Sequence, residues 1–360
     1  MAAAPLDVTN GIILNPKSAI LCIPDVVLGV GEAMRRREFI ILFGGAAAAW
    51  PLVARAQQPG KVFRIGFLGV SRDAPGTAAN YKVFSDELRE KGFSEGHNLV
   101  IEYRRSDDPR GVSVAGAELR HAHLDVIVAQ GSEVVLKAVL DPSRPIPIVL
   151  QAINYDPIAR GYVTSFARPG GDITGLFYQQ AEIAAKKVEL LTQAVPGRTS
   201  LGILWDALVT DEFEAAQRAA EALRLELHAL KLENPPYNFT AAFQAIGQTG
   251  AQMLLVLSSP LFALHRREIA KLAIDHRLPA MFIFKTYVEA GGLMSYGVDQ
   301  LVMHRRTADF VAEILKGTKP ADLPIEQPTK FELTINLQTA KALGITFPQS
   351  MLVAADGVIE

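Results

Sequence analysis

The sequence predicts an α/β fold made of two similar lobes, each with a parallel β-sheet flanked by helices. Its 360 residues are enough for two domains of ordinary size. Short apolar segments alternate with amphipathic helical segments, which is the pattern of βαβ units. The alternation begins near residue 62 and starts again near residue 200, so we expect two lobes of comparable size.

In the first lobe, short apolar runs bounded by turn residues predict buried strands. These runs lie at residues 62–69, 99–104, 124–129 and 146–150. A helix is expected over residues 77–91, because Tyr81, Phe84 and Leu88 fall on one face and Gly92 can end it. Strands separated by helical segments favour parallel pairing.

The second lobe repeats the pattern without recognisable sequence identity to the first. Its expected strands lie at residues 201–205, 225–232, 253–257 and 280–284. Apolar residues at helical spacing continue from residue 210 to residue 227, which predicts a long helix after the first of these strands.

The tail is expected to cross between the lobes and to complete both. It contains an amphipathic helix at residues 301–316, a final strand at 331–336 and a short helix at 338–343 that Gly344 ends. We therefore expect residues 61–176 with about 296–320 to form the first lobe. The second lobe is expected to comprise residues 177–295 with about 321–360.

An export signal peptide is predicted at residues 34–56. Three arginines precede an uncharged run of 16 residues, at positions 39–54, and a transmembrane helix would need roughly 20. The Ala-Arg-Ala sequence ending at Ala56 has the form of a signal-peptidase site and makes Gln57 the first mature residue. Arg36 and Arg37 fit a twin-arginine signal, and a general secretory signal is the alternative.

The predicted location is therefore the periplasm. Residues 1–33 stand in front of this signal, and we expect them to be an extension ahead of a true start at Met34.

Composition excludes several functional classes. The formal net charge is −2, which argues against a nucleic-acid-binding protein. The only cysteine, Cys22, leaves no internal disulfide. No dinucleotide loop, phosphate loop or nucleophile elbow occurs, and the seven histidines lack metal-ligand spacing. We therefore expect no cofactor, no metal and no catalytic residues.

The candidate ligand site is a cleft between the two lobes, because ligands of open α/β sheets bind beyond the carboxyl ends of the strands. The strand-end loops offer aromatic, hydroxyl and charged side chains, which is the usual composition of a small-molecule site. The candidate ligand-binding residues are Ser71, Arg72, Gly131, Ser132, Asn154, Tyr155, Asp156, Phe177, Tyr178, Asp206, Ser258, Ser259, Lys285, Thr286 and Asp299.

Most of these residues have a structural alternative. Tyr155 and Asp156 are also suited to shaping a turn before Pro157. The aromatic pair at 177–178 would serve equally as core at the lobe junction. Lys285 could extend to solvent, and Asp299 could cap the helix that follows it.

Four segments of the mature chain resemble one known family. They are residues 92–103 (GFSEGHNLVIEY), 146–161 (IPIVLQAINYDPIARG), 168–175 (RPGGDITG) and 314–348. Over residues 61–348 the chain resembles the ABC-transporter substrate-binding proteins of the tryptophan/tyrosine-binding group. The resemblance implies the type I periplasmic binding protein fold, in which two Rossmann-like lobes hinge around a ligand.

The same resemblance implies a monomeric receptor without catalytic activity. Such a receptor captures a small molecule and delivers it to a membrane permease with its ATPase. A ligand-sensing protein that signals to a membrane receptor is the alternative, and an exported α/β enzyme is a weaker one. A cytoplasmic regulator is disfavoured by the export signal.

The chain departs from amino-acid-binding members of this family at two positions. Ser259 stands where those members commonly have an acidic residue that holds the ligand's amine, and Lys285 adds a positive charge after the next strand. These changes predict a small organic acid, aromatic or not, or an amino-acid-like compound. Its carboxylate is expected near Lys285 and the backbone donors at Gly131.

Overall fold

A computed structural model describes residues 61–69, 78–106, 109–178 and 180–360. The first sheet is parallel throughout, with the strand order β11-β5-β4-β3-β1-β2. Its strands are β1 (Phe63–Gly69), β2 (Leu99–Arg105), β3 (Val126–Gly131), β4 (Ile148–Ile153), β5 (Ile173–Tyr178) and β11 (Ile325–Glu326). The predicted signal peptide, Ser71 and Arg72 lie outside the described residues.

The second sheet has the order β13-β12-β10-β9-β8-β6-β7, and among its pairs only β10 with β12 is antiparallel. Its strands are β6 (Ser200–Asp206), β7 (Glu226–Leu232), β8 (Met253–Val256), β9 (Ala280–Phe282), β10 (Met294–Val298), β12 (Phe331–Asn336) and β13 (Gly357–Ile359). The predicted α/β class with two mostly parallel sheets is confirmed.

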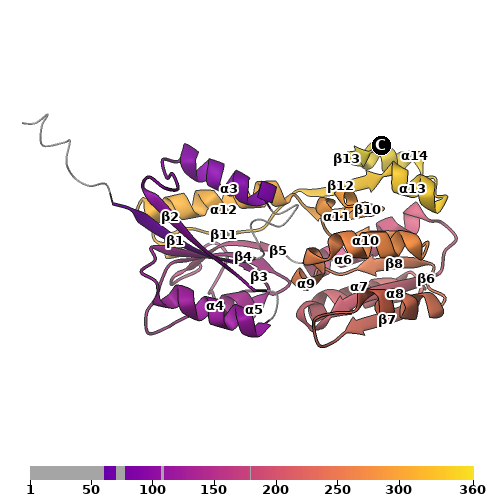
Figure 1. The fold of residues 1–360 in the computed structure, drawn as a ribbon, viewed down its shortest axis with the longest axis horizontal. Coiled ribbons are helices and arrows are strands. Elements are labelled where there is room, and N and C mark those ends of the chain that lie inside the picture. The colour runs from indigo at the N-terminus through magenta and orange to yellow at the C-terminus, as the bar shows by residue number, and fades with distance from the viewer. Residues whose placement is uncertain (1–60, 70–77, 107–108, 179) are drawn as a thin grey trace, which may run out of the picture. The chain divides into compact units, whose positions relative to one another are not determined.

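Helices cover both faces of the first sheet (Figure 1). On one face lie α3 (Ala78–Glu90) and α12 (Gln300–Leu315), and on the other lie α4 (Pro109–His121) and α5 (Glu133–Val139). Side chains alternate along β1 to fill both cores, because successive residues of a strand point to opposite faces. Phe67 packs in the α3 and α12 core and Leu68 in the α4 and α5 core.

The second sheet is also covered on both faces. Its helices are α6 (Gln180–Ala194), α7 (Thr210–Ala222), α8 (Phe239–Gln248), α9 (Pro260–Leu264), α10 (Arg266–Asp275), α11 (Lys285–Glu289), α13 (Leu337–Leu343) and α14 (Gln349–Ala354), with a short 3₁₀ turn η1 (Ala207–Val209). A second 3₁₀ turn, η2 (Pro320–Asp322), contacts β5 of the first sheet. Leu201 and Ile203 on β6 pack with α6 and α7, whereas Leu204 packs in the core that includes α8 and α10.

The chain passes between the sheets three times, at slightly different places than expected. β5 stays in the first sheet through Tyr178, and β10 stays in the second sheet through Val298. β11 pairs with β5, so residues 325–326 belong to the first sheet although we expected the second lobe to resume near residue 321. A two-residue strand carries too little periodicity to be recognised in a sequence.

The long helix expected over residues 210–227 ends earlier, at Ala222. Arg224 takes a positive φ of 56°, which breaks the helix before β7 begins at Glu226. Leu223 is consequently exposed, although its spacing matched the apolar face.

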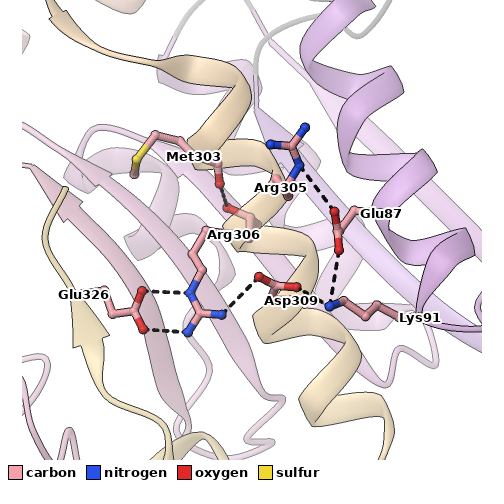
Figure 2. Close-up of polar contacts among 8 residues, drawn as sticks. Glu87, Lys91, Met303, Arg305, Arg306, Asp309 and Glu326 are labelled. Atoms are coloured by element: carbon pink, nitrogen blue, oxygen red, sulfur yellow. Dashed lines mark hydrogen bonds and ion pairs between the residues drawn. The ribbon is translucent and has the colours of Figure 1, made fainter. Parts of the chain in front are cut away.

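An ion-pair network fastens α12 to the rest of the first lobe (Figure 2). Arg306 donates from Nη2 and Nε to the two carboxylate oxygens of Glu326 on β11, at 2.6 and 2.8 Å. It also donates to Asp309 at 3.1 Å, and Asp309 lies 2.9 Å from the Lys91 ammonium just after α3. These contacts hold α12 against β11 and against the end of α3.

Among the residues that the structure describes, no helix combines the length and the apolar character needed to span a bilayer.

Candidate functional site

A cavity of about 120 Å³ lies where strand ends of both sheets meet. The first sheet contributes the ends of β1, β2, β3 and β4, and the second contributes residues that follow β6, β8 and β9. An engineered apolar cavity of roughly 150 Å³ holds one benzene. The space is therefore suited to a ligand about the size of a single ring.

Four of the residues predicted from the sequence line this cavity: Gly131, Ser132, Ser258 and Thr286. Gly131 has a φ of 135°, which an L side chain rarely adopts, so a glycine is needed where β3 turns into α5. Ser132 precedes α5, but its hydroxyl makes no capping bond, so it remains available at the cavity wall.

The hydroxyl of Ser258 is held by neighbours on both sides. Ser258 donates from its backbone N–H and its Oγ–H to Glu212, and it accepts a 2.7 Å hydrogen bond from Asn154 Nδ2. Glu212 also pairs with Lys187, and both of these side chains are 0% exposed. The hydrogen bond between the predicted residues Asn154 and Ser258 therefore joins the end of β4 to the second sheet, and the buried charge pair holds Ser258 in place.

Ser259 and Asp206 face each other behind the cavity wall. Ser259 donates its hydroxyl hydrogen to Asp206, and the same carboxylate accepts from Tyr237 at 3.2 Å and from the Leu208 backbone at 2.9 Å. Burial raises the pKa of Asp206 above its usual value, while these hydrogen bonds oppose the shift. Both residues shape the loop that carries Leu208 to the cavity.

Five predicted residues take structural positions instead. Tyr155, Phe177 and Tyr178 are buried in the hydrophobic cores of the first lobe. Asp156 accepts from the backbone of Ile158 and Ala159 and so fixes a turn. Asp299 accepts from the first N–H groups of α12 and caps that helix. For Phe177, Tyr178, Asp156 and Asp299 the geometry matches the structural alternative that the sequence left open. Tyr155, whose alternative was to shape a turn, is buried in a core instead.

Lys285 lies beside the cavity rather than in it. Its side chain is 54% exposed and its ammonium lies 3.9 Å from Glu289. It lines a neighbouring hollow of about 190 Å³, which shares Asn80, Thr286 and Gln300 with the cavity. The cation that we expected to face the ligand is therefore largely in solvent.

A different cation, Arg266, lines the cavity. Arg266 is only 7% exposed, and its Nη1 donates to the Ala263 carbonyl at 2.8 Å. No carboxylate among the described residues forms an ion pair with it, and burial lowers the pKa of Arg266 below its ordinary value. The sequence did carry a signal, since Arg266 shares the helical face of the buried residues Ile269, Ala270 and Ala273.

The first lobe contributes a buried chain of hydrogen-bonded side chains at the cavity, which sequence reasoning also missed. This polar ladder consists of His304, Gln130, Gln151 and Thr307. Gln130 Nε2 donates to Gln151 Oε1 at 2.9 Å and lies 3.1 Å from His304 Nε2. The two glutamines are register partners on β3 and β4, so each stands at the same point of an otherwise apolar strand. Burial lowers the pKa of His304 to about 4, and the ring is neutral at neutral pH.

Side chains of the types that bind metals do not gather within the part of the chain that the structure describes. Asn80, which is buried at the start of α3, adds a further amide to the cavity wall. The site thus combines one guanidinium, neutral hydrogen-bonding groups and aromatic faces, which suits binding of a small polar molecule.

Comparison with known proteins identifies the family. A family model described as "ABC transporter substrate binding protein" matches residues 69–359, which is most of the chain. The chain is 23% identical over 284 residues to a tyrosine-binding protein of Clostridioides difficile, covering 77% of this chain and 80% of the relative.

Two solved structures share the fold closely. A conserved domain protein of Vibrio cholerae is 25% identical with a TM-score of 0.74, covering 83% of this chain and 100% of the other. An ABC domain in complex with L-Trp from Streptococcus pneumonia is 25% identical with a TM-score of 0.73, covering 82% and 99%.

Proposed function

Because the chain belongs to the family of ABC transporter substrate-binding proteins, which are receptors and not enzymes, we propose that it is an exported receptor for a small organic acid. It captures this ligand between its lobes and delivers it to an ABC permease with its ATPase. It acts as a monomer, as the resemblance seen in the sequence implies.

The observation that carries the ligand class is the position of Arg266. A buried charge without a counter-ion is costly, because the lost hydration is not replaced. Arg266 has one carbonyl acceptor and no ion-pair partner among the described residues. A carboxylate bound in the cavity would supply the missing partner, and a guanidinium can hold it through two parallel hydrogen bonds.

Arg266 replaces Lys285 in this proposal. A cation at the cavity still favours an anionic ligand. The exposed Lys285 ammonium is hydrated and close to Glu289, so it gains less from a ligand carboxylate.

A planar ring fits the remainder of the cavity. Tyr81, Tyr103 and Phe284 line it, and aromatic faces pack well against a flat apolar group. The two relatives with printed ligands are a tyrosine-binding protein and a domain complexed with L-Trp. Both ligands carry a ring and a carboxylate, and an aromatic acid or an amino-acid-like compound shares these groups.

Export by the signal at residues 34–56 completes the proposal. Cleavage after Ala56 would leave Gln57 at the start of the mature chain, in the periplasm. The twin-arginine route is the one that Arg36 and Arg37 favour.

A thermal-shift screen of the purified protein tests the ligand class. The panel comprises aromatic and aliphatic carboxylic acids, α-amino acids, and the neutral amides of the same acids. A ligand that binds only the folded state raises the melting temperature, by an amount that grows with the logarithm of its concentration above Kd. We expect shifts with carboxylates and none with the matching amides.

Two charge-removing variants provide the control. Arg266→Met should strongly reduce the shifts, whereas Lys285→Met should leave them nearly intact because Lys285 lies outside the cavity. Equal shifts with acids and amides, or full binding by Arg266→Met, would refute the assignment of an anionic ligand.

A further inference from the structure

The polar ladder beside the cavity begins and ends at backbone carbonyls of α12. His304 Nδ1 lies 2.8 Å from the Gln300 carbonyl, and Thr307 Oγ1 lies 2.9 Å from the Met303 carbonyl. A carbonyl oxygen can only accept a hydrogen bond. These two ends therefore fix the direction of every hydrogen bond between them.

At the His304 end, the ring must donate from Nδ1 to the Gln300 carbonyl. The imidazole is neutral, so its other nitrogen, Nε2, carries no hydrogen and can only accept. Gln130 Nε2, at 3.1 Å, is the donor to it. One hydrogen of the Gln130 amide is thereby committed.

At the Thr307 end, the hydroxyl hydrogen is used on the Met303 carbonyl, so Thr307 Oγ1 accepts from Gln151 Nε2. The Gln151 oxygen must then face Gln130, whose Nε2 donates to it at 2.9 Å. The second hydrogen of the Gln130 amide is also committed. The Gln130 side chain cannot be rotated by 180° without placing acceptors against acceptors.

The free end of Gln130 is consequently its oxygen. Gln130 lines the cavity together with Gly69, and a Cβ on Gly69 would lie 2.9 Å from Gln130 Oε1. The absence of a side chain at Gly69 keeps the space in front of this oxygen open. The wall of the first lobe thus presents a hydrogen-bond acceptor whose orientation the buried ladder fixes.

We propose that Gln130 Oε1 selects ligands carrying a hydrogen-bond donor, a hydroxyl or an N–H group, in addition to the anionic group held by Arg266. This inference rests on the proposed function, because it specifies the ligand of the same cavity. The ligand class is then a small acid with a donor group that meets the first lobe while its carboxylate meets the second. A ligand lacking the donor would bury an unpaired carbonyl oxygen.

Matched acids test the donor requirement. The probes are benzoate, phenylacetate and 3-phenylpropionate, each with a hydroxyl or a fluorine at the ortho, meta or para position. Fluorine is close to a hydroxyl in size but cannot donate a hydrogen. Titration calorimetry on the purified protein should show at least one hydroxyl acid binding about tenfold or more tightly than its fluorine analogue.

Three variants separate the roles of the two walls. Gln130→Met removes the acceptor and should bring the hydroxyl-to-fluorine affinity ratio close to one. Gly69→Ala places a Cβ 2.9 Å from Oε1, so it either covers this oxygen or displaces the Gln130 side chain, and it should reduce the same ratio. Arg266→Met should weaken both members of each pair equally and leave the ratio unchanged.

The outcomes distinguish this inference from the proposed function. If the acids bind and no hydroxyl is preferred at any position, the donor requirement is wrong and the receptor for organic acids stands. A preference that survives in both Gln130→Met and Gly69→Ala would likewise overturn the role of Gln130. If no acid binds, the proposed ligand class fails and the donor requirement fails with it.

Discussion

Replacing Lys187 by methionine should destabilise the protein strongly. Lys187 on α6 pairs with Glu212 on α7, and neither side chain has any exposed surface. Methionine has a similar length, so the change removes the charge with little loss of packing volume. Glu212 would then remain as a buried carboxylate whose remaining hydrogen-bond donors are the backbone and hydroxyl of Ser258.

The expected loss of stability follows from leaving Glu212 buried without its partner. Breaking a fully buried ion pair by removing one partner costs about 3–5 kcal/mol. For a chain of this size, that corresponds to a drop in melting temperature of roughly 6–10 °C. Exposed pairs such as Arg306 with Glu326 should cost about 1 kcal/mol or less when broken, because solvent screens them.

Urea unfolding followed by tryptophan fluorescence measures the loss for Lys187→Met, Glu212→Gln and the double variant. The double variant contains neither of the two buried charges, and the glutamine at position 212 can still accept a hydrogen bond from Ser258. We therefore expect the double variant to be more stable than the sum of the single losses predicts, by about 2 kcal/mol or more.

Two results would refute the reasoning. A loss below about 1 kcal/mol for Lys187→Met would mean that water or a rearranged neighbour compensates Glu212. Simple additivity of the two single variants would mean that the two charges do not stabilise each other.

Three other predictions concern backbone space, acid stability and export. Gly175→Ala should cost about 3 kcal/mol or more, since its φ is 127° and an added Cβ would lie 2.2 Å from the Leu150 carbonyl oxygen. Gly197→Ala, with open space at a φ of 85°, should cost only about 1 kcal/mol in the same urea assay. His304 binds its proton more weakly in the folded than in the unfolded state, so stability should fall by about 3 kcal/mol between about pH 6.5 and about pH 4. The stability of His304→Gln should not show this fall at low pH. A pH–stability curve parallel to that of the wild type would contradict the role of His304. Finally, N-terminal sequencing of the periplasmic protein should begin at Gln57, and replacing Arg36 and Arg37 by lysine should retain the precursor inside the cell; unchanged export of that variant would favour the general secretory route.

Local sequence patterns were sufficient to predict most of the fold. The buried strands are short apolar runs, and their character does not depend on partners far away in the chain. The end of α13 was predictable for the same reason, since Gly344 has a φ of 69° that favours glycine. Asp299 was predictable as a cap because capping joins residues that are neighbours in sequence.

The cavity was harder to predict because its polar groups are defined by distant contacts. Arg266 and Arg267 are adjacent, and although helical spacing marks the first as buried, only the packing of α10 brings it to the cavity. The orientation of Gln130 depends on His304, 174 positions away. Strand-end position alone suggested Tyr155 and Phe177 equally well, but both fill cores beneath the loops.

Because α12 packs on the first sheet, the core of the first lobe can be completed only late in synthesis. Phe310 and Val311 on this helix belong to the same core as Ile65 and Phe67 on β1. About 120 residues separate the end of β5 from α12, and a ribosome adds roughly 5–20 residues per second. One face of the first sheet is therefore covered only by α3 for about ten seconds after its five main strands have been made. The N-terminal lobe cannot complete its core before the C-terminal lobe has been synthesised, so the nascent chain has an apolar surface that needs protection until the tail arrives.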